Sequence, residues 1–266
     1  MARFTDADDL KSSDFHRVDL SGSRFYGSDL EGSWIVSCDL SGVVLRGIEA
    51  TTLEIDSPWL FDGEGSLLVN GVNVLPLVDA ELNRRFPGRA ERYAETPDGL
   101  RTSWDALQRT WAATLERAAV MPEGTVDVSV DGEWSFAQTL RHLVLATDMW
   151  LRRGILGVEQ PFHPLGQVDA GSAREMDTSE LADGTPSYAE VLEARAGRVA
   201  MVGDFLAGLT PELLAEERPN PHDPQYPETV RSCLHTILEE EWEHHRYAVR
   251  DLDAIEARAA GRSVAE

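Results

Sequence analysis

The sequence predicts a chain of two parts: a short coil of five-residue units, followed by a four-helix bundle. Large apolar residues recur at every fifth position from residue 10 to residue 45. After Gly99 the apolar spacing changes to three and four residues, the period of an amphipathic α-helix, and it does so in four segments. The composition, 42% hydrophobic and 27% charged among 266 residues, is that of a globular protein.

The first 50 positions repeat with a period of five. The large apolar residues of the repeat are Leu10, Phe15, Leu20, Phe25, Leu30, Ile35, Leu40 and Leu45. Two positions before each of them stands a mostly small residue: Asp8, Ser13, Val18, Ser23, Ser28, Ser33, Cys38 and Val43. A period of five fits neither a helix nor a strand. A squared coil explains it, because each unit can form one side and point its large residue toward the axis.

These units resemble the pentapeptide-repeat family from Asp6 to Leu45. The resemblance implies a right-handed quadrilateral β-helix, and eight units make about two coils. Asp8, Val18 and Val43 depart from the usual small residue. Because neighbouring coils must bury each other's faces, so short a solenoid needs a cap from the rest of the chain. We assign this domain to residues 1–50.

The chain is acidic, with 47 Asp and Glu against 24 Lys and Arg and a net charge of −23. This charge argues against binding to nucleic acid and to anionic membranes, which both require basic residues. Residues 1–50 hold only nine acidic and five basic residues, so DNA mimicry by the coil is disfavoured against a structural cap or an interaction surface.

The sequence also predicts where the protein is found and what it binds. It has no apolar run of the ~18 residues that span a bilayer, and no signal peptide at its start. Two cysteines, Cys38 and Cys233, make no disulfide framework. We therefore expect a cytoplasmic protein with a small-molecule substrate. A homodimer is compatible with the sequence.

Residues 51–98 are expected to form a connector or cap, with a short hairpin and a small helix near Val78–Arg85. The bundle is assigned to residues 99–266. Its first helix carries the stripe Leu100, Trp104, Leu107, Trp111, Leu115 and Ala118. The second and third open with capping boxes at Ser135 and Ser187, and the second runs to about Leu156. The fourth starts after Pro227 and runs to about Ala259.

Two long connections, residues 157–186 and 210–228, interrupt the predicted bundle. They are rich in proline and glycine, including Gly171 in the first. Connections of this length in a compact domain are usually lids, binding loops or crossovers. We expect at least one of them to cross an end of the bundle, and both to lie over a pocket.

One inward turn of the fourth predicted helix carries polar residues. Between Ile237 and Ala248, Glu241 lies at the centre of the apolar stripe and His245 about 40° to one side. Glu and His at i and i+4 project from the same face, so one metal ion can contact both. A carboxylate in a bundle core is costly unless it is paired or bound to a metal. His142, beside the apolar face of the second helix, can supply a third ligand.

Other side chains are alternatives at this site. Glu240 and His244 share the same spacing but lie further toward solvent on the helical wheel, and His235 could also be drawn in. Ordinary acid–histidine pairs, with His142 satisfied in the core, explain the spacing equally well. Loop or surface positions are expected for His16, His163 and His222, of which His163 could line a pocket.

Two segments resemble the DinB/YfiT-like superfamily. WSFAQTLRHL, ending at Leu143, resembles its second-helix motif, and EWEHHR, ending at Arg246, resembles its last-helix ligand pair. The resemblance covers about residues 99–259. It implies a four-helix bundle of up-down-down-up topology with a divalent metal held near one end. Carried over by position, the ligands are His142, Glu241 and His245.

The sequence departs from the superfamily pattern at two places. Glu241 stands where a His is commoner, as it does in related mycothiol-dependent isomerases, and Tyr247-Ala248 replaces the usual Gly-Gln. Two imidazoles and a carboxylate suit Zn, with Ni, Mn or Fe as alternatives, and leave coordination positions open.

The resemblance also implies an activity, a thiol-dependent S-transferase with mycothiol or bacillithiol as co-substrate. In that mechanism the metal lowers the pKa of the thiol, and the thiolate attacks an electrophile. Asp148 and His244 are candidates for orienting a water or acting as a base. The alternatives are a metal-dependent hydrolase or oxygenase, and a non-enzymatic interaction module that uses the pentapeptide coil.

Overall fold

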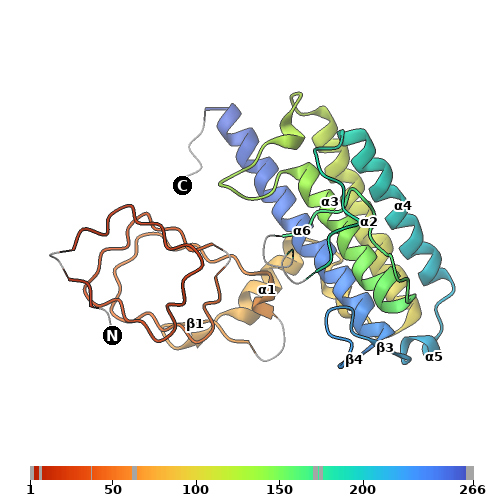
Figure 1. Ribbon diagram of the computed structural model, residues 1–266, viewed down its shortest axis with the longest axis horizontal. Coiled ribbons are helices and arrows are strands. Elements are labelled where there is room, and N and C mark those ends of the chain that lie inside the picture. Colours follow the sequence, from red (N-terminus) through yellow and green to blue (C-terminus); the bar gives the residue numbers. More distant parts are fainter. Residues whose placement is uncertain are drawn as a thin grey trace. The chain divides into compact units, whose positions relative to one another are not determined.

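The computed structural model describes residues 3–5, 8–36, 38–61, 65–169, 173 and 176–261. The chain divides into two units, residues 1–55 and residues 56–266 (Figure 1). Asp6, where the predicted repeat begins, and Gly171, in the first long connection, lie outside the described residues.

The first unit is a succession of tight turns at ten-residue intervals. The main-chain N–H groups of Ser13, Ser23, Ser33 and Val43 each donate to the carbonyl three residues earlier, at 3.0–3.2 Å. An aspartate just before each turn, at residues 9, 19, 29 and 39, accepts a main-chain N–H from two residues further on. Gly22, Gly32 and Gly42 have φ between +70° and +73°, a conformation that glycine adopts without strain. Positive φ recurs at residues 12, 17, 22, 27, 32, 42 and 47, so the structure keeps the five-residue period, and a hydrogen-bonded turn forms at every second one of these positions.

The structure does not confirm a two-coil quadrilateral β-helix. No strand forms among residues 3–5, 8–36 and 38–55. The large residues predicted to point inward remain 42% to 64% exposed, as at Leu10 and Phe25. Two coils share a single stacking interface, so such a stack has little opportunity to bury its apolar side chains.

The second unit begins with small elements. A 3₁₀ helix, η1 (Pro58–Phe61), is followed by the antiparallel hairpin β1 (Leu68–Val69) and β2 (Val72–Asn73). Helix α1 (Leu75–Arg85) and the 3₁₀ helix η2 (Arg89–Tyr93) lead to the bundle. The hairpin and small helix expected in the connector are therefore present.

The four predicted bundle helices are confirmed. They are α2 (Pro97–Val120), α3 (Phe136–Thr147), α4 (Tyr188–Ala207) and α6 (Val230–Ala259). Both predicted capping boxes form, because Ser135 and Ser187 each exchange hydrogen bonds with the residue three positions on. Helix α3 continues as a π-helix, η4 (Asp148–Ile155), so the second helical segment ends where the sequence predicted.

Contacts near the helix ends fix the topology. Arg117, near the end of α2, donates to Glu256, near the end of α6 (2.8 Å), so these two helices run parallel. Arg101, near the start of α2, donates to the main-chain oxygen of Leu209 beyond the end of α4 (2.8 Å), so α4 runs the opposite way. The ring of Tyr188, at the start of α4, lies 6.4 Å from the ring of Phe136, the first residue of α3, so α3 and α4 run parallel. In chain order, the helices α2, α3, α4 and α6 therefore run up, down, down and up.

In this arrangement α2 and α3 each pack against both α4 and α6 (Figure 1). The core is lined by large apolar side chains from all four helices, including Leu100, Trp104, Leu107, Trp111, Leu140, Leu143, Val202, Leu206, Leu234, Ile237 and Trp242. Burying one such side chain contributes about 1.5–3 kcal/mol.

Short elements fill the remaining connections. The 3₁₀ helix η3 (Thr125–Asp127) lies between α2 and α3. The second long connection contains α5 (Pro211–Leu214) and an antiparallel hairpin, β3 (Glu217–Pro219) with β4 (Pro227–Thr229), which leads into α6. In the described part of the chain, no helix combines the length and apolar character needed to cross a membrane.

Candidate metal centre

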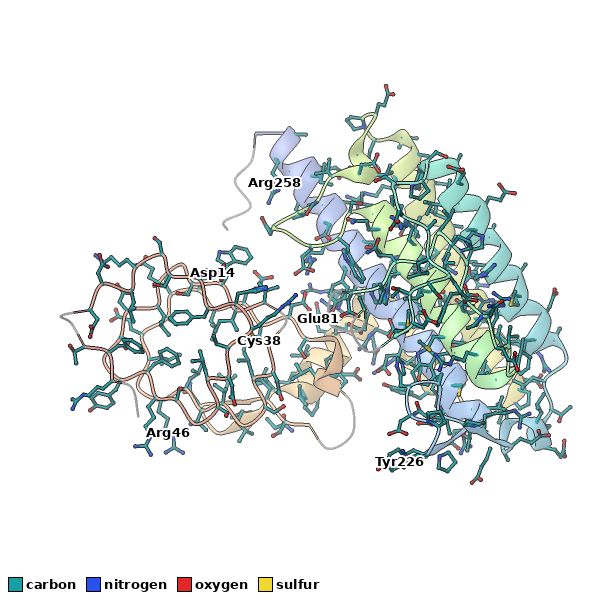
Figure 2. The ribbon with its side chains drawn as sticks, in the orientation of Figure 1. Asp14, Cys38, Arg46, Glu81, Tyr226 and Arg258 are labelled. Carbon is teal, nitrogen blue, oxygen red and sulfur yellow. The ribbon has the colours of Figure 1, made fainter. Side chains whose placement is uncertain are left out.

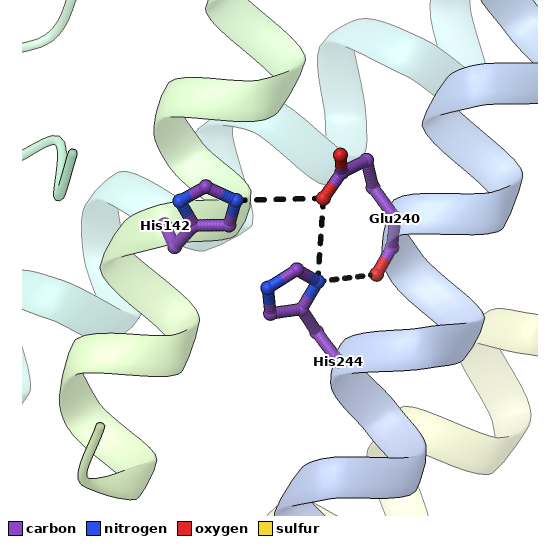
Figure 3. Close-up of side chains that lie close together, drawn as sticks. All are labelled: His142, Glu240 and His244. Carbon is purple, nitrogen blue, oxygen red and sulfur yellow. Dashed lines mark hydrogen bonds and ion pairs between the residues drawn. The ribbon is translucent and has the colours of Figure 1, made fainter. Parts of the chain in front are cut away.

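Three side chains from two neighbouring helices meet where α3 faces α6. His142 lies on α3, and Glu240 and His244 lie one turn apart on α6 (Figure 3). The Oε2 atom of Glu240 is 3.4 Å from Nε2 of His142 and 3.3 Å from Nδ1 of His244. One ligand atom from each residue lies within 4.8 Å of the other two. The side chains are only 14% to 16% exposed.

The loop that follows α3 orients His142. Nδ1 of His142 lies 3.0 Å from the main-chain oxygen of Gln167, which can only accept a hydrogen bond. Nδ1 therefore carries the proton, and Nε2 is left facing Glu240. Two further hydrogen bonds fix the loop on α3, one from Nε of Arg141 to the carbonyl of Leu165 (2.9 Å) and one from the N–H of Gln167 to the carbonyl of Arg141 (3.2 Å). Metal-ligating histidines are commonly held in this way.

Aromatic rings cover the two imidazoles. The indole of Trp134, just before the N-cap of α3, lies 4.7 Å from the ring of His142 and 6.3 Å from that of His244, nearly parallel to the latter. The ring of Tyr247 meets His244 edge-on at 5.7 Å. These contacts hold the imidazoles in place and shield one side of the cluster from water.

The electrostatics of the cluster are those of an ion pair. Burial lowers the pKa of His142, but its hydrogen bond to Glu240 and the carboxylate charge raise it by more, so the net shift is upward. Burial raises the pKa of Glu240, and the interactions with His142 and His244 reverse that shift to a net lowering. Burial and the nearby charge of His142 lower the pKa of His244 to about 4. In the metal-free chain both shifts favour a protonated His142 beside an ionised Glu240.

The donor set fits a divalent metal. Metal–ligand bonds of about 2.0–2.2 Å separate neighbouring ligand atoms by roughly 3–3.5 Å, and the two contacts to Glu240 fall in this range. Nδ1 of His244 also lies 2.8 Å from the main-chain oxygen of Glu240. A metal bond at Nδ1 would replace that hydrogen bond. Two imidazoles and one carboxylate leave positions open, as at catalytic rather than structural sites.

The structure does not assemble the set His142, Glu241 and His245, because Glu241 points elsewhere. Its carboxylate accepts hydrogen bonds from Nη2 of Arg195 on α4. Both side chains are buried, at 1% and 5% exposed. Burial raises the pKa of Glu241, against the lowering effect of Arg195. An arginine therefore offsets the cost of burying this carboxylate, a partner that the prediction did not include.

His245 faces a third direction. Its Nε2 lies 2.8 Å from Oγ1 of Thr114 on α2, and that hydroxyl donates to the carbonyl of Thr110 (3.3 Å). The imidazole is therefore the donor to Thr114. Aromatic rings surround it: Phe86 at 5.7 Å, Trp111 at 5.0 Å and Trp242 at 6.1 Å. Burial lowers the pKa of His245 to about 4, so this histidine is neutral near pH 7.

The directions of the helices explain the difference. The centre of the apolar stripe of α6 faces the interior of the bundle, where Glu241 meets α4, and His245 faces α2. The neighbouring positions 240 and 244 face α3. The helical wheel placed this second pair toward solvent because it could not show which side of α6 the second helix would cover.

The other candidate residues lie apart from the cluster or beside it. Asp148 is fully buried and accepts two hydrogen bonds from Arg198, both at 2.9 Å. Nε2 of His235 lies 2.9 Å from the carbonyl of Ala94. His163 accepts the N–H of Leu165 through Nδ1 at 3.1 Å. His16 is exposed in the first unit, and His222 lies on the β3–β4 hairpin.

The sequence by itself did not predict that Gln167 orients His142. The contact is made by the main-chain oxygen of Gln167, and a main-chain contact leaves no signal in a sequence.

Two family models match the two parts of the chain. The family model described as DinB superfamily matches residues 106–248, and the model for pentapeptide repeats matches residues 2–42 in eight copies. No curated protein matches the chain significantly. Among solved structures, the chain is similar to YfiT from Bacillus subtilis, described as a probable metal-dependent hydrolase with an unusual four-helix bundle topology. The two are 16% identical, with a TM-score of 0.40, over 61% of this chain and 89% of that one.

Proposed function

The chain belongs to the DinB superfamily, and from this premise we propose that it is a metal-dependent enzyme whose metal is held by His142, Glu240 and His244. The observation that carries the proposal is the convergence of these three side chains from α3 and α6. Zn suits two imidazoles and one carboxylate, and Ni, Mn and Fe are the alternatives. When bound, the metal lowers the pKa of a thiol or water in an open position and supplies a nucleophile near neutral pH.

The residues around the proposed centre orient its ligands and cover one side of it. Gln167 fixes the tautomer of His142, so that Nε2 presents a lone pair to the metal. Glu240 contributes the negative charge that favours a divalent cation. Trp134 covers both imidazoles on one side, so a substrate approaches from another side. The loop that carries Gln167 borders the site on the side of His142.

The reaction we propose is transfer of a low-molecular-weight thiol, such as mycothiol or bacillithiol, to an electrophile. The sulfur atom loses its proton, forms a bond to an electrophilic carbon, and the leaving group departs with the electron pair of the broken bond. This specific reaction rests on the family resemblance. The geometry alone accommodates a hydrolase equally well, with water in place of the thiol.

Metal content and thiol conjugation test the proposal. Mass spectrometry of the purified protein is expected to find about one equivalent of metal in the wild type and much less in Glu240→Ala. Glu241→Gln is the matched control, one residue away, and is expected to keep the metal. The loaded wild type should then join a thiol to a chlorinated electrophile such as monochlorobimane.

Each step has an outcome that contradicts the proposal. Absence of metal from the wild type after incubation with each ion would rule out a metal enzyme. Metal-dependent product that forms without any thiol would replace the transferase with a hydrolase.

A further inference from the structure

Tyr247 connects the candidate metal centre to a group of charged side chains. Its ring meets the imidazole of His244 edge-on at 5.7 Å. The guanidinium carbons of Arg246 and Arg250 lie over the same ring, 4.4 Å and 5.1 Å from its centre. Cations at such distances are attracted to the face of an aromatic ring. The ring of Tyr247 is therefore in contact with one proposed ligand and with two arginines.

Asp56 bridges the two arginines. Its Oδ1 accepts a hydrogen bond from Nη2 of Arg246 at 2.6 Å, and its Oδ2 accepts from Nη1 of Arg246 at 3.1 Å and from Nη1 of Arg250 at 2.8 Å. The side chain of Asp56 is 25% exposed. Because both guanidinium groups are positive and lie against one ring, they repel each other, and the carboxylate of Asp56 offsets that repulsion. Asp56 thus keeps both cations on Tyr247.

The bridging carboxylate comes from outside the superfamily segment. Asp56 is the first residue of the second unit, and both it and Arg250 lie outside the matched residues 106–248. Each arginine has a second partner on α6: Nε of Arg246 donates to Glu243 at 3.0 Å, and Nε of Arg250 donates to Asp251 at 2.7 Å. These partners hold the arginines one at a time, whereas Asp56 bonds to both. Its loss therefore removes the bridge and leaves each arginine its own partner.

We propose that Asp56 is a positioning residue of the metal centre. By holding the two arginines on Tyr247, it keeps the imidazole of His244 in the orientation that a bound metal requires. The hydrogen bond between Nδ1 of His244 and the main-chain oxygen of Glu240 is lost when a metal takes that nitrogen. Aromatic packing must then orient the imidazole, and the ring of Tyr247 supplies part of it. The inference rests on the proposed function, since it requires His244 to be a metal ligand.

Binding of Co²⁺ to the metal-free protein tests the proposal, because the visible absorption of the ion reports both its affinity and the arrangement of its ligands. In Asp56→Asn the affinity is expected to fall about tenfold, and the absorption bands are expected to shift. Tyr247→Leu should have the same effect, whereas Tyr247→Phe keeps the ring and should stay within about twofold of the wild type. Arg250→Gln is a second variant that keeps the carboxylate, and it should lower the affinity as well.

A double variant separates positioning from ordinary stabilisation. If Asp56 acts through Tyr247, adding Asp56→Asn to Tyr247→Leu lowers the affinity for Co²⁺ no further, because the ring that Asp56 holds is already absent. A carboxylate that merely stabilised the fold would add its own loss to that of the ring. Circular dichroism shows that each variant keeps its helices.

Glu256→Gln is the matched control. It removes a carboxylate of α6 that accepts a hydrogen bond from Arg117 at 2.8 Å, about three turns beyond His244. The residue stands two positions before Arg258, which is labelled near the end of α6 in Figure 2. Although this variant also loses an ion pair and a negative charge, it should change neither the affinity for Co²⁺ nor the spectrum.

The outcomes separate this inference from the proposed function. Wild-type affinity and an unchanged spectrum in Asp56→Asn overturn the role of Asp56 and leave the metal centre intact. Additive losses in the double variant, or an equal loss in Glu256→Gln, overturn it as well. A wild type that binds no Co²⁺ overturns the metal centre and this inference together.

Discussion

Nδ1 of His142 lies 3.0 Å from the main-chain oxygen of Gln167. Helix α3 and the loop that carries Gln167 thus orient this imidazole together. The helix sets where the ring is, and the loop sets which nitrogen carries the proton and which faces Glu240. Because the partner is a carbonyl of the main chain, the conformation of the loop matters here more than the identity of residue 167.

The first prediction concerns the ligand set. Alanine at His142, Glu240 or His244 is expected to weaken metal binding by at least about 100-fold, more than changes outside the ligand shell usually cost. Isothermal titration with Zn²⁺ measures the affinity. Glu241→Gln and His245→Gln are the controls, and both should bind metal as the wild type does. The opposite pattern, with metal lost only in these controls, would restore Glu241 and His245 as ligands.

The second prediction concerns the buried pair of Arg195 and Glu241. Removing one partner leaves the other charge buried without compensation, so Glu241→Ala and Arg195→Ala should each lower the free energy of unfolding by about 3–5 kcal/mol. The double variant Arg195→Met with Glu241→Leu should cost less than either single change. Urea unfolding followed by circular dichroism measures all three. Single variants as stable as the wild type would show that the ion pair does not stabilise the bundle.

The third prediction is a pH dependence of stability caused by His245. Its pKa in the folded chain is about 4, below the ordinary value of 6.5. Between these values the unfolded chain binds a proton that the folded chain does not, so stability falls as the pH is lowered from 6.5 to 4. The contribution of His245 is up to about 3 kcal/mol. His245→Gln should flatten this part of the stability profile, whereas His16→Gln, in the first unit, should leave it unchanged.

The fourth prediction is that metal binding releases a proton. Burial lowers the pKa of His142 but Glu240 raises it by more, so the net shift is upward and a proton competes with the metal. Metal affinity should therefore fall as the pH is lowered, and the fall should begin above the ordinary histidine pKa of 6.5. Titration calorimetry in two buffers of different ionisation enthalpy counts the protons released. Equal heats in both buffers would contradict a protonated His142 in the metal-free chain.

The sequence by itself determined the helices and their limits. Thr96, Ser135, Ser187 and Thr229 cap the helices that the apolar spacing indicated, because capping and periodicity act between residues close in the chain. The same local rules placed a Glu and a His one turn apart on α6. They placed two such pairs in adjacent registers, and the helical wheel favoured Glu241 and His245.

Only the tertiary structure decided which pair lies beside His142. Residues 240 and 244 face α3 and His142, whereas Glu241 meets Arg195 on α4 and His245 meets Thr114 on α2. Which helix covers which side of α6 depends on how all four helices cross, and the two pairs differ by only one residue, about 100° around the helix. The contact of Gln167 with His142 is likewise set by a loop whose path follows from packing, since it is not encoded by spacing along the chain.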